Sequence, residues 1–271
     1  MLDHLGRYKS EELKVKEPGN FHYRGQDLEK PHILPKNRAR DNLLELVRPE
    51  YDSLLDSRER KLKWHRYFHH LNSSQALAVN LFQPFLQKAA RNSLLASLLG
   101  LEAPLTKVGF EHIPDEREGT NVDFFAEGQD GGNLLVEVKF TERGFGKAKD
   151  DVRHRQKYEE VYRDQLRATT LLNENDRMEF FSAYQFFRNA IHAGLKKHVA
   201  TRVWFLVPRD NTAVRLAAKR SMIHLKSEIA AHVQVIELES FLEEIEAAVL
   251  GEPELVNHFA HFRRKYVVPV D

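Results

Sequence analysis

Apolar residues in the first half of the chain recur first at helical spacing and then in short runs typical of strands. After a polar stretch over residues 1–41, helical spacing continues over residues 42–70 with an interruption near Pro49. It returns over residues 76–99, where Pro84 should kink or divide the helix. Three β-prone runs follow, and the Gly-rich turn between the second and third favours a hairpin. These three predicted strands cover residues 107–113, 122–126 and 134–140.

The second half alternates predicted helices with predicted strands. Because strands separated by helices need crossover connections, this order indicates a parallel or mixed extension of the sheet. The expected fold class is therefore α/β, a mixed β-sheet core flanked by helices in the order α-β-β-β-α-β-α-β-α. Residues 1–70 are expected to form an N-terminal arm and helical extension packed on a core domain of residues 71–271. The later helices are predicted over residues 150–172, 180–198, 212–230 and 240–249, and the later strands over residues 201–207 and 232–237.

The predicted hairpin brings two acidic residues and one lysine to the same place. Side chains alternate between the two faces of a strand, so Glu137 and Lys139 point one way while Val136 and Val138 point the other. Pairing across the hairpin then places Asp123 beside Glu137. Two carboxylates can hold Mg²⁺ or Mn²⁺ together with water and a substrate phosphate, and such a metal activates water for attack on phosphorus. Lys139 would orient that water or stabilise charge on the phosphate.

The sequence leaves other readings of these residues open. An acid-x-Lys pair on a half-exposed strand is often a weak surface ion pair. Asp115 rivals Asp123 as the first metal ligand because it follows Pro114 directly. We prefer Asp123, since Asp115 lies in a charged loop that no strand follows at once. Glu111, on the preceding predicted strand, is either a third metal ligand or an outward-facing strand acid.

This arrangement resembles the PD-(D/E)XK nuclease superfamily, which includes many restriction endonucleases and repair nucleases. The resemblance carries the family's Asp, Glu and Lys onto Asp123, Glu137 and Lys139, and it departs from the motif where Val122 replaces proline. The predicted order of helices and strands also matches the superfamily core. The resemblance implies a restriction endonuclease-like fold, Mg²⁺-dependent hydrolysis of DNA, and the main-chain carbonyl of Val138 as a further metal ligand.

Three other segments narrow the resemblance. Residues 71–77, 80–85 and 184–189 are similar to segments of a bacterial branch of restriction endonucleases. This likeness would cover most of residues 30–250, but its motifs are less specific than the acidic pair and the lysine.

Positive charge must be concentrated locally if the protein binds nucleic acid, because the net charge is only +1. A basic segment follows the hairpin, and its place beside the candidate metal site favours contacts with phosphate, although such runs are usually solvated faces. On a later helix, Gln185 and Arg188 either clamp phosphate or form a structural pair. Gln75 either faces the site or makes a capping or buried hydrogen bond. The basic residues expected to contact DNA are Arg143, Lys147, Arg153 and Arg155.

Composition limits the remaining classes. The chain has no cysteine, which excludes disulfides, thiolate zinc sites and a cysteine nucleophile. No apolar run is long enough to span a bilayer, so we expect a cytoplasmic location and no membrane partner. The expected function is a DNA-cleaving nuclease, either a restriction or a repair endonuclease, and a homodimer would suit double-strand cleavage by a single-site enzyme. The alternatives are a non-catalytic DNA-binding or scaffold protein that keeps the fold, and a nuclease that cleaves RNA.

Overall fold

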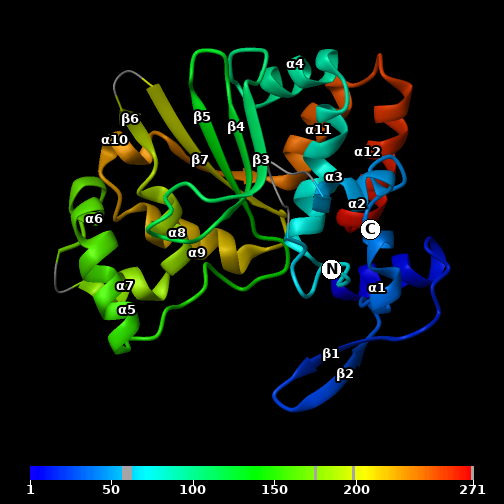
Figure 1. The fold of residues 1–271 in the computed structure, drawn as a ribbon, viewed down its shortest axis with the longest axis horizontal. Helices are drawn as coiled ribbons and strands as arrows, with labels where there is room; N and C mark the ends of the chain where they lie inside the picture. The colour runs from blue at the N-terminus through cyan, green and yellow to red at the C-terminus, as the bar shows by residue number, and fades with distance from the viewer. Residues whose placement is uncertain (57–62, 174–175, 197–198, 270–271) are drawn as a thin grey trace. The chain divides into compact units, whose positions relative to one another are not determined.

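The computed structural model describes residues 1–56, 63–173, 176–196 and 199–269, and its chain divides into two compact units (Figure 1). Unit 1 consists of Met1–Leu98 with Glu239–Asp271, and unit 2 consists of Leu99–Leu238. The boundary predicted near residue 70 lies inside unit 1. The two units therefore follow packing in space rather than the sequence-based division.

Unit 1 is mainly helical and includes a two-stranded antiparallel hairpin. The N-terminal stretch, expected to be a polar arm, contains a regular helix and this hairpin, whose turn uses left-handed backbone at Arg24 and Gly25. The elements of unit 1 are α1 (Leu2–Glu11), β1 (Gly19–Tyr23), β2 (Gln26–Lys30), η1 (Lys36–Asn42), η2 (Arg48–Glu50), α2 (Tyr51–Asp56), α3 (Ser74–Leu86), α4 (Ala89–Leu98), α11 (Leu238–Ala248, whose first residue belongs to unit 2) and α12 (Pro253–Tyr266).

The long helix α3 forms where its sequence predicts it. Ser73 is the N-cap, and its hydroxyl accepts a hydrogen bond from the Ala76 N–H at 3.3 Å. Every residue from Gln75 to Phe85 is buried, which explains why the helix is apolar around its whole circumference. Pro84 lies in the last turn, and the helical stretch divides just after it, between Leu86 and Ala89.

The helix predicted over residues 42–70 is wrong in the residues that the structure describes. Short 3₁₀ turns and α2 replace it, residues 57–62 lie outside the described part, and residues 63–70 form turns. Asn42 gives the physical reason, because its buried amide donates to the main-chain oxygens of Phe68 at 2.6 Å and His70 at 2.7 Å. These bonds hold an irregular segment where a helix would leave the amide without partners.

A buried polar network joins the chain's two ends within unit 1. Asn80 accepts from the Leu44 N–H at 2.7 Å and donates to the Asn42 oxygen at 2.9 Å and the Tyr266 hydroxyl at 2.8 Å. Lys265 is fully buried, and its ammonium donates to both Asn42 oxygens at 2.6 Å. Burial lowers the pKa of Lys265 well below its usual value.

The stability of unit 1 should fall in acid because of His258, a buried histidine of α12. Its Nε2 bonds to the Asn80 carbonyl oxygen at 2.7 Å and must therefore be the protonated nitrogen. Its Nδ1 is buried without a hydrogen-bond partner among the described residues, so a second proton there would have no acceptor. Burial accordingly lowers the pKa of His258 from 6.5 to about 4.

Proton linkage gives the direction in which the free energy of unfolding changes with pH. Between pH 6.5 and about 4 the unfolded chain binds a proton at His258 that the folded chain does not. The stabilisation is therefore complete above pH 6.5 and is lost as the pH falls, by about 2 kcal/mol at pH 5. Urea unfolding at pH 7 and pH 5 measures it, with Trp64 fluorescence in a Trp204→Phe background as the unit 1 signal. His258→Gln should weaken the pH dependence without abolishing it, because burial also lowers the pKa of His70, whereas His22→Gln on the exposed hairpin should leave the pH dependence unchanged. An equal slope in wild type and His258→Gln would contradict the assignment.

Unit 2 is built on a mixed six-stranded sheet. The strand order is β3-β4-β5-β7-β6, and β8 pairs with β7. The three predicted hairpin-region strands pair antiparallel, while β5–β7 and β7–β8 are parallel, which confirms the predicted mixed sheet. The strands are β3 (Lys107–His112), β4 (Val122–Glu127), β5 (Asn133–Val138), β6 (Gly194–Lys196), β7 (Val199–Val207) and β8 (Val233–Glu237).

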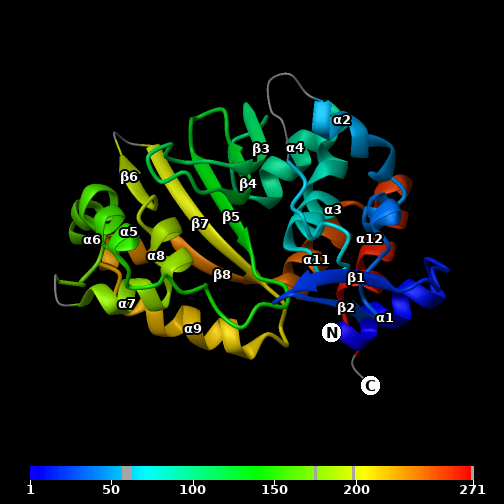
Figure 2. The same cartoon turned by 60° about the horizontal axis from the view of Figure 1, so that its bottom comes forward.

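Helices α5 to α8 lie together on one side of this sheet (Figures 1 and 2). Aromatic residues of this layer pack on the sheet face that carries Val203, Phe205 and Val207 of β7, and Phe186 stacks on Phe205 at 4.9 Å between ring centroids. This packing sets the position of α8 over β5 and β7. The helices of unit 2 are α5 (Val152–Lys157), the π-helical turn η3 (Tyr158–Tyr162), α6 (Arg163–Thr169), α7 (Arg177–Ser182), α8 (Tyr184–Ala190), α9 (Thr212–Met222) and α10 (Ser227–Ala230).

The helix predicted over residues 180–198 ends early. It divides into α7 and α8, and α8 ends at Ala190, after which the short strand β6 begins at Gly194. Gly194 has a φ of +122°, a backbone conformation that excludes a helix and suits glycine. The strand β6 is an addition to the predicted order of elements.

Among the described helices of both units, none combines the length and apolarity needed to cross a bilayer.

Candidate active site

The register of the sheet aligns three acidic residues in one row. Phe124 pairs with Phe110 of β3 on one side and with Val136 of β5 on the other. Moving one residue along each strand places Asp123 opposite both Glu111 and Glu137. Residues directly opposite each other in an antiparallel pair share a face of the sheet, so this row collects negative charge on the side covered by α8.

Asp123 sits at the centre of this row. Its Oδ2 accepts a hydrogen bond from the Val138 main-chain N–H at 2.7 Å, which ties the first strand of the hairpin to the end of the second. Burial raises the pKa of Asp123 well above its usual value, and the negative charges of Glu137 and Glu111 raise it further. This repulsion follows from the register, which places Asp123 opposite both glutamates.

Glu137 and Lys139 form a buried ion pair two residues apart on one face of β5 and its continuation. The Lys139 Nζ donates to the Glu137 Oε1 at 2.7 Å, and the two side chains are only 4% and 6% exposed, respectively. Burial alone would lower the pKa of Lys139, but the charges of Glu137, Glu142 and Asp123 outweigh it and raise that pKa. Lys139 therefore stays an ammonium ion. The weak surface ion pair that the pattern also allowed does not describe this pair.

Two amides of α8 complete the surroundings of Glu137. Gln185 Oε1 accepts from Lys139 at 2.8 Å, and its Nε2 donates to the Glu137 Oε1 at 3.3 Å. Asn189, one turn later on the same helix face, donates to the Glu137 Oε2 at 3.2 Å. Phe186 holds the helix in this place, because it stacks on Phe205, the register partner of Glu137.

Sequence reasoning missed Asn189 and proposed Gln185 for phosphate binding. The i, i+4 spacing of two amides on one helix was the signal that could have linked them. Gln185 lies against the acidic pair and lysine, so its first neighbours are Lys139 and Glu137. Its role toward a substrate phosphate remains a prediction.

Glu111 has an unusual backbone. Its φ is +51°, which costs energy in a non-glycine residue and distorts β3 where it meets the acidic row. Its carboxylate accepts a hydrogen bond from the Asn121 amide. The register places Glu111 opposite Asp123, and its negative charge is one cause of the raised pKa of Asp123.

Asp115 is committed to a different partner. Its carboxylate binds Arg117 through the main-chain N–H at 2.9 Å and through the guanidinium at 2.6 Å. The Arg117 guanidinium and N–H lower the pKa of Asp115 to about 2. Asp123 and not Asp115 is therefore the aspartate that the structure places beside Glu137.

The donor set suits a hard divalent cation. Carboxylates forced together out of water carry uncompensated charge, which a bound dication would neutralise. The ammonium group of Lys139 offsets part of this negative charge. It pairs with Glu137 rather than with Asp123. The described residues include no cluster of three or more His, Asp or Glu side chains arranged to hold a metal by themselves. Asp123, Glu137 and the Val138 carbonyl would thus leave several coordination positions to water and substrate, as Mg²⁺ usually requires.

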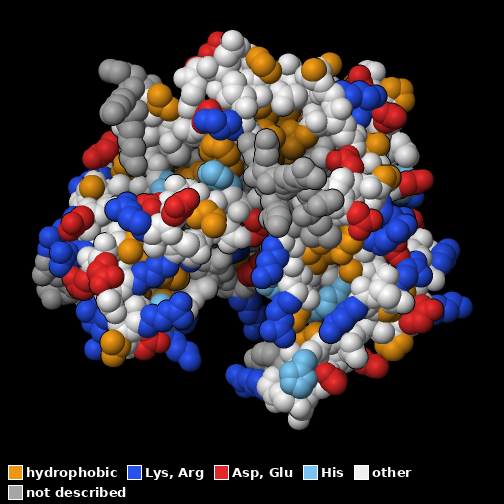
Figure 3. Space-filling model, in the orientation of Figure 1, with side chains coloured by type: hydrophobic (Ala, Val, Ile, Leu, Met, Phe, Trp, Pro, Cys, Tyr) orange, Lys and Arg blue, Asp and Glu red, His pale blue; other side chains and the backbone are white. Residues whose placement is uncertain are grey.

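The residues predicted to bind DNA fall into two groups. Arg143, Lys147 and Arg153 are exposed, whereas Arg155 is exposed but paired with Asp150 at 2.8 Å. On the face shown in Figure 3, Lys and Arg side chains over α5 to α7 are interspersed with acidic side chains.

Arg188 and Gln75 are both buried. The Arg188 guanidinium lies over the Tyr184 ring at 5.0 Å, and its Nε has no hydrogen-bond partner among the described residues. Gln75, in unit 1, accepts from the His65 N–H at 2.8 Å and donates to the Lys63 oxygen at 3.1 Å. The main chain therefore satisfies Gln75, in line with the buried hydrogen bond that the sequence left open.

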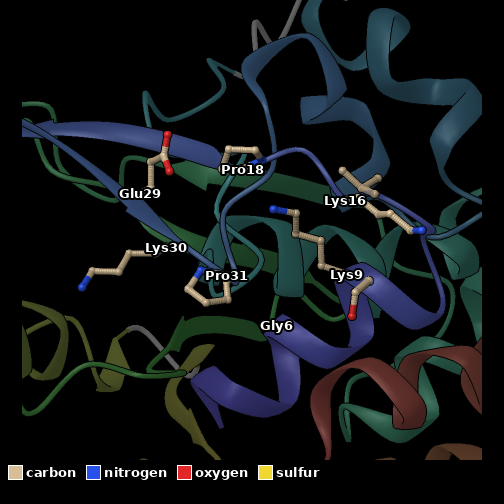
Figure 4. Close-up of a pocket in the computed structure, with 9 residues that line it drawn as sticks. Gly6, Lys9, Lys16, Pro18, Glu29, Lys30 and Pro31 are labelled. Atoms are coloured by element: carbon tan, nitrogen blue, oxygen red, sulfur yellow. The ribbon is translucent and has the colours of Figure 1, made fainter.

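A hollow of about 450 Å³ in unit 1 has a different chemistry (Figure 4). Its lining includes Lys9, Lys16 and Lys30 with a single carboxylate, Glu29. Lys9 is 4% exposed, and burial lowers its pKa. This lining of three lysines and one carboxylate differs from the paired carboxylates beside Lys139 in unit 2.

Comparison with known proteins places the chain in a family. Searches of curated proteins and of solved structures gave no match. A family model described as "Restriction Endonuclease associating with ARP" matches residues 2–267, which include nearly all of both units. The match agrees with the mixed sheet flanked by helices. The chain belongs to this family of restriction endonucleases.

Proposed function

We propose that the protein is a metal-dependent nuclease of the PD-(D/E)XK type that hydrolyses phosphodiester bonds in DNA. The observation that carries the proposal is the meeting of Asp123, Glu137 and Lys139 on one face of the β4–β5 hairpin, with Lys139 buried and charged. Membership in a restriction endonuclease family supports the substrate class. The family description also names ARP, and association of this chain with ARP is part of the proposal.

Asp123, Glu137 and the Val138 carbonyl would hold Mg²⁺ or Mn²⁺. When bound, the metal would polarise the phosphoryl group, lower the pKa of water and stabilise the leaving oxygen. Glu111 is close enough to contribute through charge, although its carboxylate is bonded to Asn121.

Lys139 has one donor left for the reaction. An ammonium group has three N–H donors, and here one binds Glu137 and another binds Gln185. The third can orient the attacking water or bind a phosphate oxygen, where it would stabilise the charge that develops in the transition state. Gln185 and Asn189 keep the acid and the lysine in place.

The proposal predicts cleavage of DNA that needs metal. Plasmid DNA and an RNA of matched sequence are incubated with the purified protein in Mg²⁺, in Mn²⁺ and in EDTA. We expect cleavage of DNA only with metal, and loss of cleavage in Asp123→Asn. RNA cleaved in preference to DNA would favour the RNA nuclease, and binding without cleavage of either would favour the non-catalytic alternative.

A thermal-shift measurement gives a readout that does not depend on activity. Mn²⁺ should raise the melting temperature of the wild type by several degrees, because the metal binds only the folded carboxylates. Asp123→Asn keeps an oxygen to accept from the Val138 N–H but removes one of the repelling charges. This variant should melt higher than wild type without metal and gain nothing from Mn²⁺. If the protein had no metal site, Mn²⁺ would leave the melting temperature of both the wild type and Asp123→Asn unchanged.

A further inference from the structure

A second hollow in unit 2 lies on the same face of the sheet as the candidate active site. Its volume is about 370 Å³. Phe125, Leu135 and Thr201 line it, and each is an odd-numbered residue of its strand, as Asp123 and Glu137 are. Since side chains alternate along a strand, these residues share one face. The hollow and the acidic row are therefore neighbours on one face of the sheet.

The distance between them matches one step along a nucleic-acid strand. Phe125 pairs with Leu135 in the register, and this pair is the next row on the same face after Asp123 and Glu137. Two residues along a strand span ~7 Å. A nucleotide whose phosphate lay at the acidic row could place its own base, or that of its neighbour, in the hollow.

An aromatic platform forms the floor of the hollow. The His112 ring stacks on the Phe125 ring with centroids 4.2 Å apart and an angle of 20° between the planes. The strained backbone of Glu111 explains how His112 reaches Phe125, because its φ of +51° interrupts the alternation of side chains just before His112. Phe125 and His112 are both only partly buried, and both rings line the hollow.

Polar groups surround the platform. Asn133 lines the hollow, and its Oδ1 is buried without a hydrogen-bond partner among the described residues. Thr201 and His192 add further polar atoms, and the His192 Nε2 lies 3.0 Å from the Glu118 Oε1. A flat platform with an amide at its edge is suited to a nucleobase, which stacks through its face and forms hydrogen bonds through its rim.

We infer that this hollow binds the base of an unpaired nucleotide next to the bond that is cut. The inference rests on the proposed nuclease function and refines its substrate. A base inside a duplex is enclosed by its neighbours and cannot reach the platform, so the substrate carries a single-stranded stretch, a frayed end or an extruded nucleotide at this point. Blunt, fully paired DNA would leave the hollow empty.

Binding experiments on the full chain separate this inference from catalysis. Fluorescence anisotropy is measured in EDTA in an Asp123→Asn background, which prevents cutting and reduces repulsion of phosphate. The probes are a single strand, a duplex with a short unpaired tail and a blunt duplex of equal length. Phe125→Leu should weaken binding of the first two by about tenfold, the size expected for losing one base–aromatic stack, and should leave blunt-duplex binding unchanged.

Two matched variants control for folding. Phe110→Leu makes the same change on the adjacent strand, where Phe110 contacts Phe124 and is absent from the lining of the hollow, and it should leave all three affinities unchanged. Phe125→Tyr keeps an aromatic ring at this position, so it should bind as tightly as phenylalanine does. A 2-aminopurine in the tail should be quenched on binding when residue 125 is aromatic and should stay bright in Phe125→Leu.

The outcomes distinguish the two proposals. Equal binding by Phe125→Leu and Phe110→Leu, or equal binding of tailed and blunt duplexes, would overturn the base site even if the wild type cuts DNA. Selective loss of tail binding in Phe125→Leu would support the base site even if the wild type fails to cut with metal.

Discussion

Lys139→Met should reduce metal-dependent DNA cleavage by roughly 100- to 1,000-fold, the usual loss when one preorganised donor to a developing charge is removed. Methionine keeps much of the buried length of the side chain but removes the ammonium that binds Glu137 and Gln185. The third N–H, aimed at water or phosphate in the proposed reaction, disappears with it. The rate of plasmid cleavage at saturating Mg²⁺ measures the effect.

The variant must be separated from simple loss of folding. Removing Lys139 leaves Glu137 buried with only the amides of Gln185 and Asn189 as partners, and a buried charge without its counter-ion is destabilising. We therefore expect a lower melting temperature without metal and partial recovery in Mn²⁺. Lys219→Met, the same change at an exposed lysine on α9 of unit 2, should keep both cleavage and stability. Cleavage by Lys139→Met at the wild-type rate, with the fold intact, would move the chemistry to other residues.

The hairpin was predictable because everything that defines it is local. A Gly-rich turn between two β-prone runs fixes the pairing, and the period of two along each strand fixes which side chains share a face. Asp123, Glu137 and Lys139 follow from those rules alone. The preference for Asp123 over Asp115 rests on the charged loop around Asp115, which no strand follows at once, whereas the bond from Arg117 to Asp115 is seen only in the structure.

Features that depend on tertiary packing were not predictable in the same way. Asn189 reaches Glu137 only because Phe186 stacks on Phe205 and fixes α8 over β5. The platform of His112 on Phe125 depends on the left-handed backbone of Glu111, which no pattern of side chains indicates. In both cases a contact between distant segments decides the geometry, so local spacing carries no signal for it.

Unit 1 shows the same limit for whole elements. The apolar residues of α12, including Leu255, Phe259 and Phe262, recur at helical spacing. The side chains on which they pack come from a distant part of the sequence, as the contact of Phe259 with Phe85 of α3 shows. The segment after Asn42 has the apolar spacing of a helix but does not form one. The buried Asn42 side-chain amide donates to the main-chain oxygens of Phe68 and His70, and these bonds keep the segment irregular. Polar side chains that bond to the main chain override the periodicity of the apolar ones.

Asn80→Ala should be the most destabilising single change in the buried polar network of unit 1, at about 3–5 kcal/mol. Asn80 is fully buried, and its side chain makes three hydrogen bonds, to the Leu44 N–H, the Asn42 oxygen and the Tyr266 hydroxyl. Alanine leaves the Leu44 N–H without this acceptor and opens a small cavity beside a neutral histidine and a buried lysine. Urea unfolding followed by Trp64 fluorescence in the Trp204→Phe background measures the loss in unit 1.

Asn257→Ala is the matched control for this prediction. Asn257 is exposed on α12, next to His258, and the same substitution there should change the free energy of unfolding by less than about 0.5 kcal/mol. Comparing Asn80→Ala with Asn257→Ala separates the effect of burial and hydrogen bonding from the effect of replacing asparagine by alanine. Because unit 1 contains both ends of the chain, we expect Asn80→Ala also to lower the urea concentration at which α12 unfolds with α3. If the two alanine variants unfolded at the same urea concentration, the network would add little to stability, and apolar packing of α3 and α12 alone would account for the stability of unit 1.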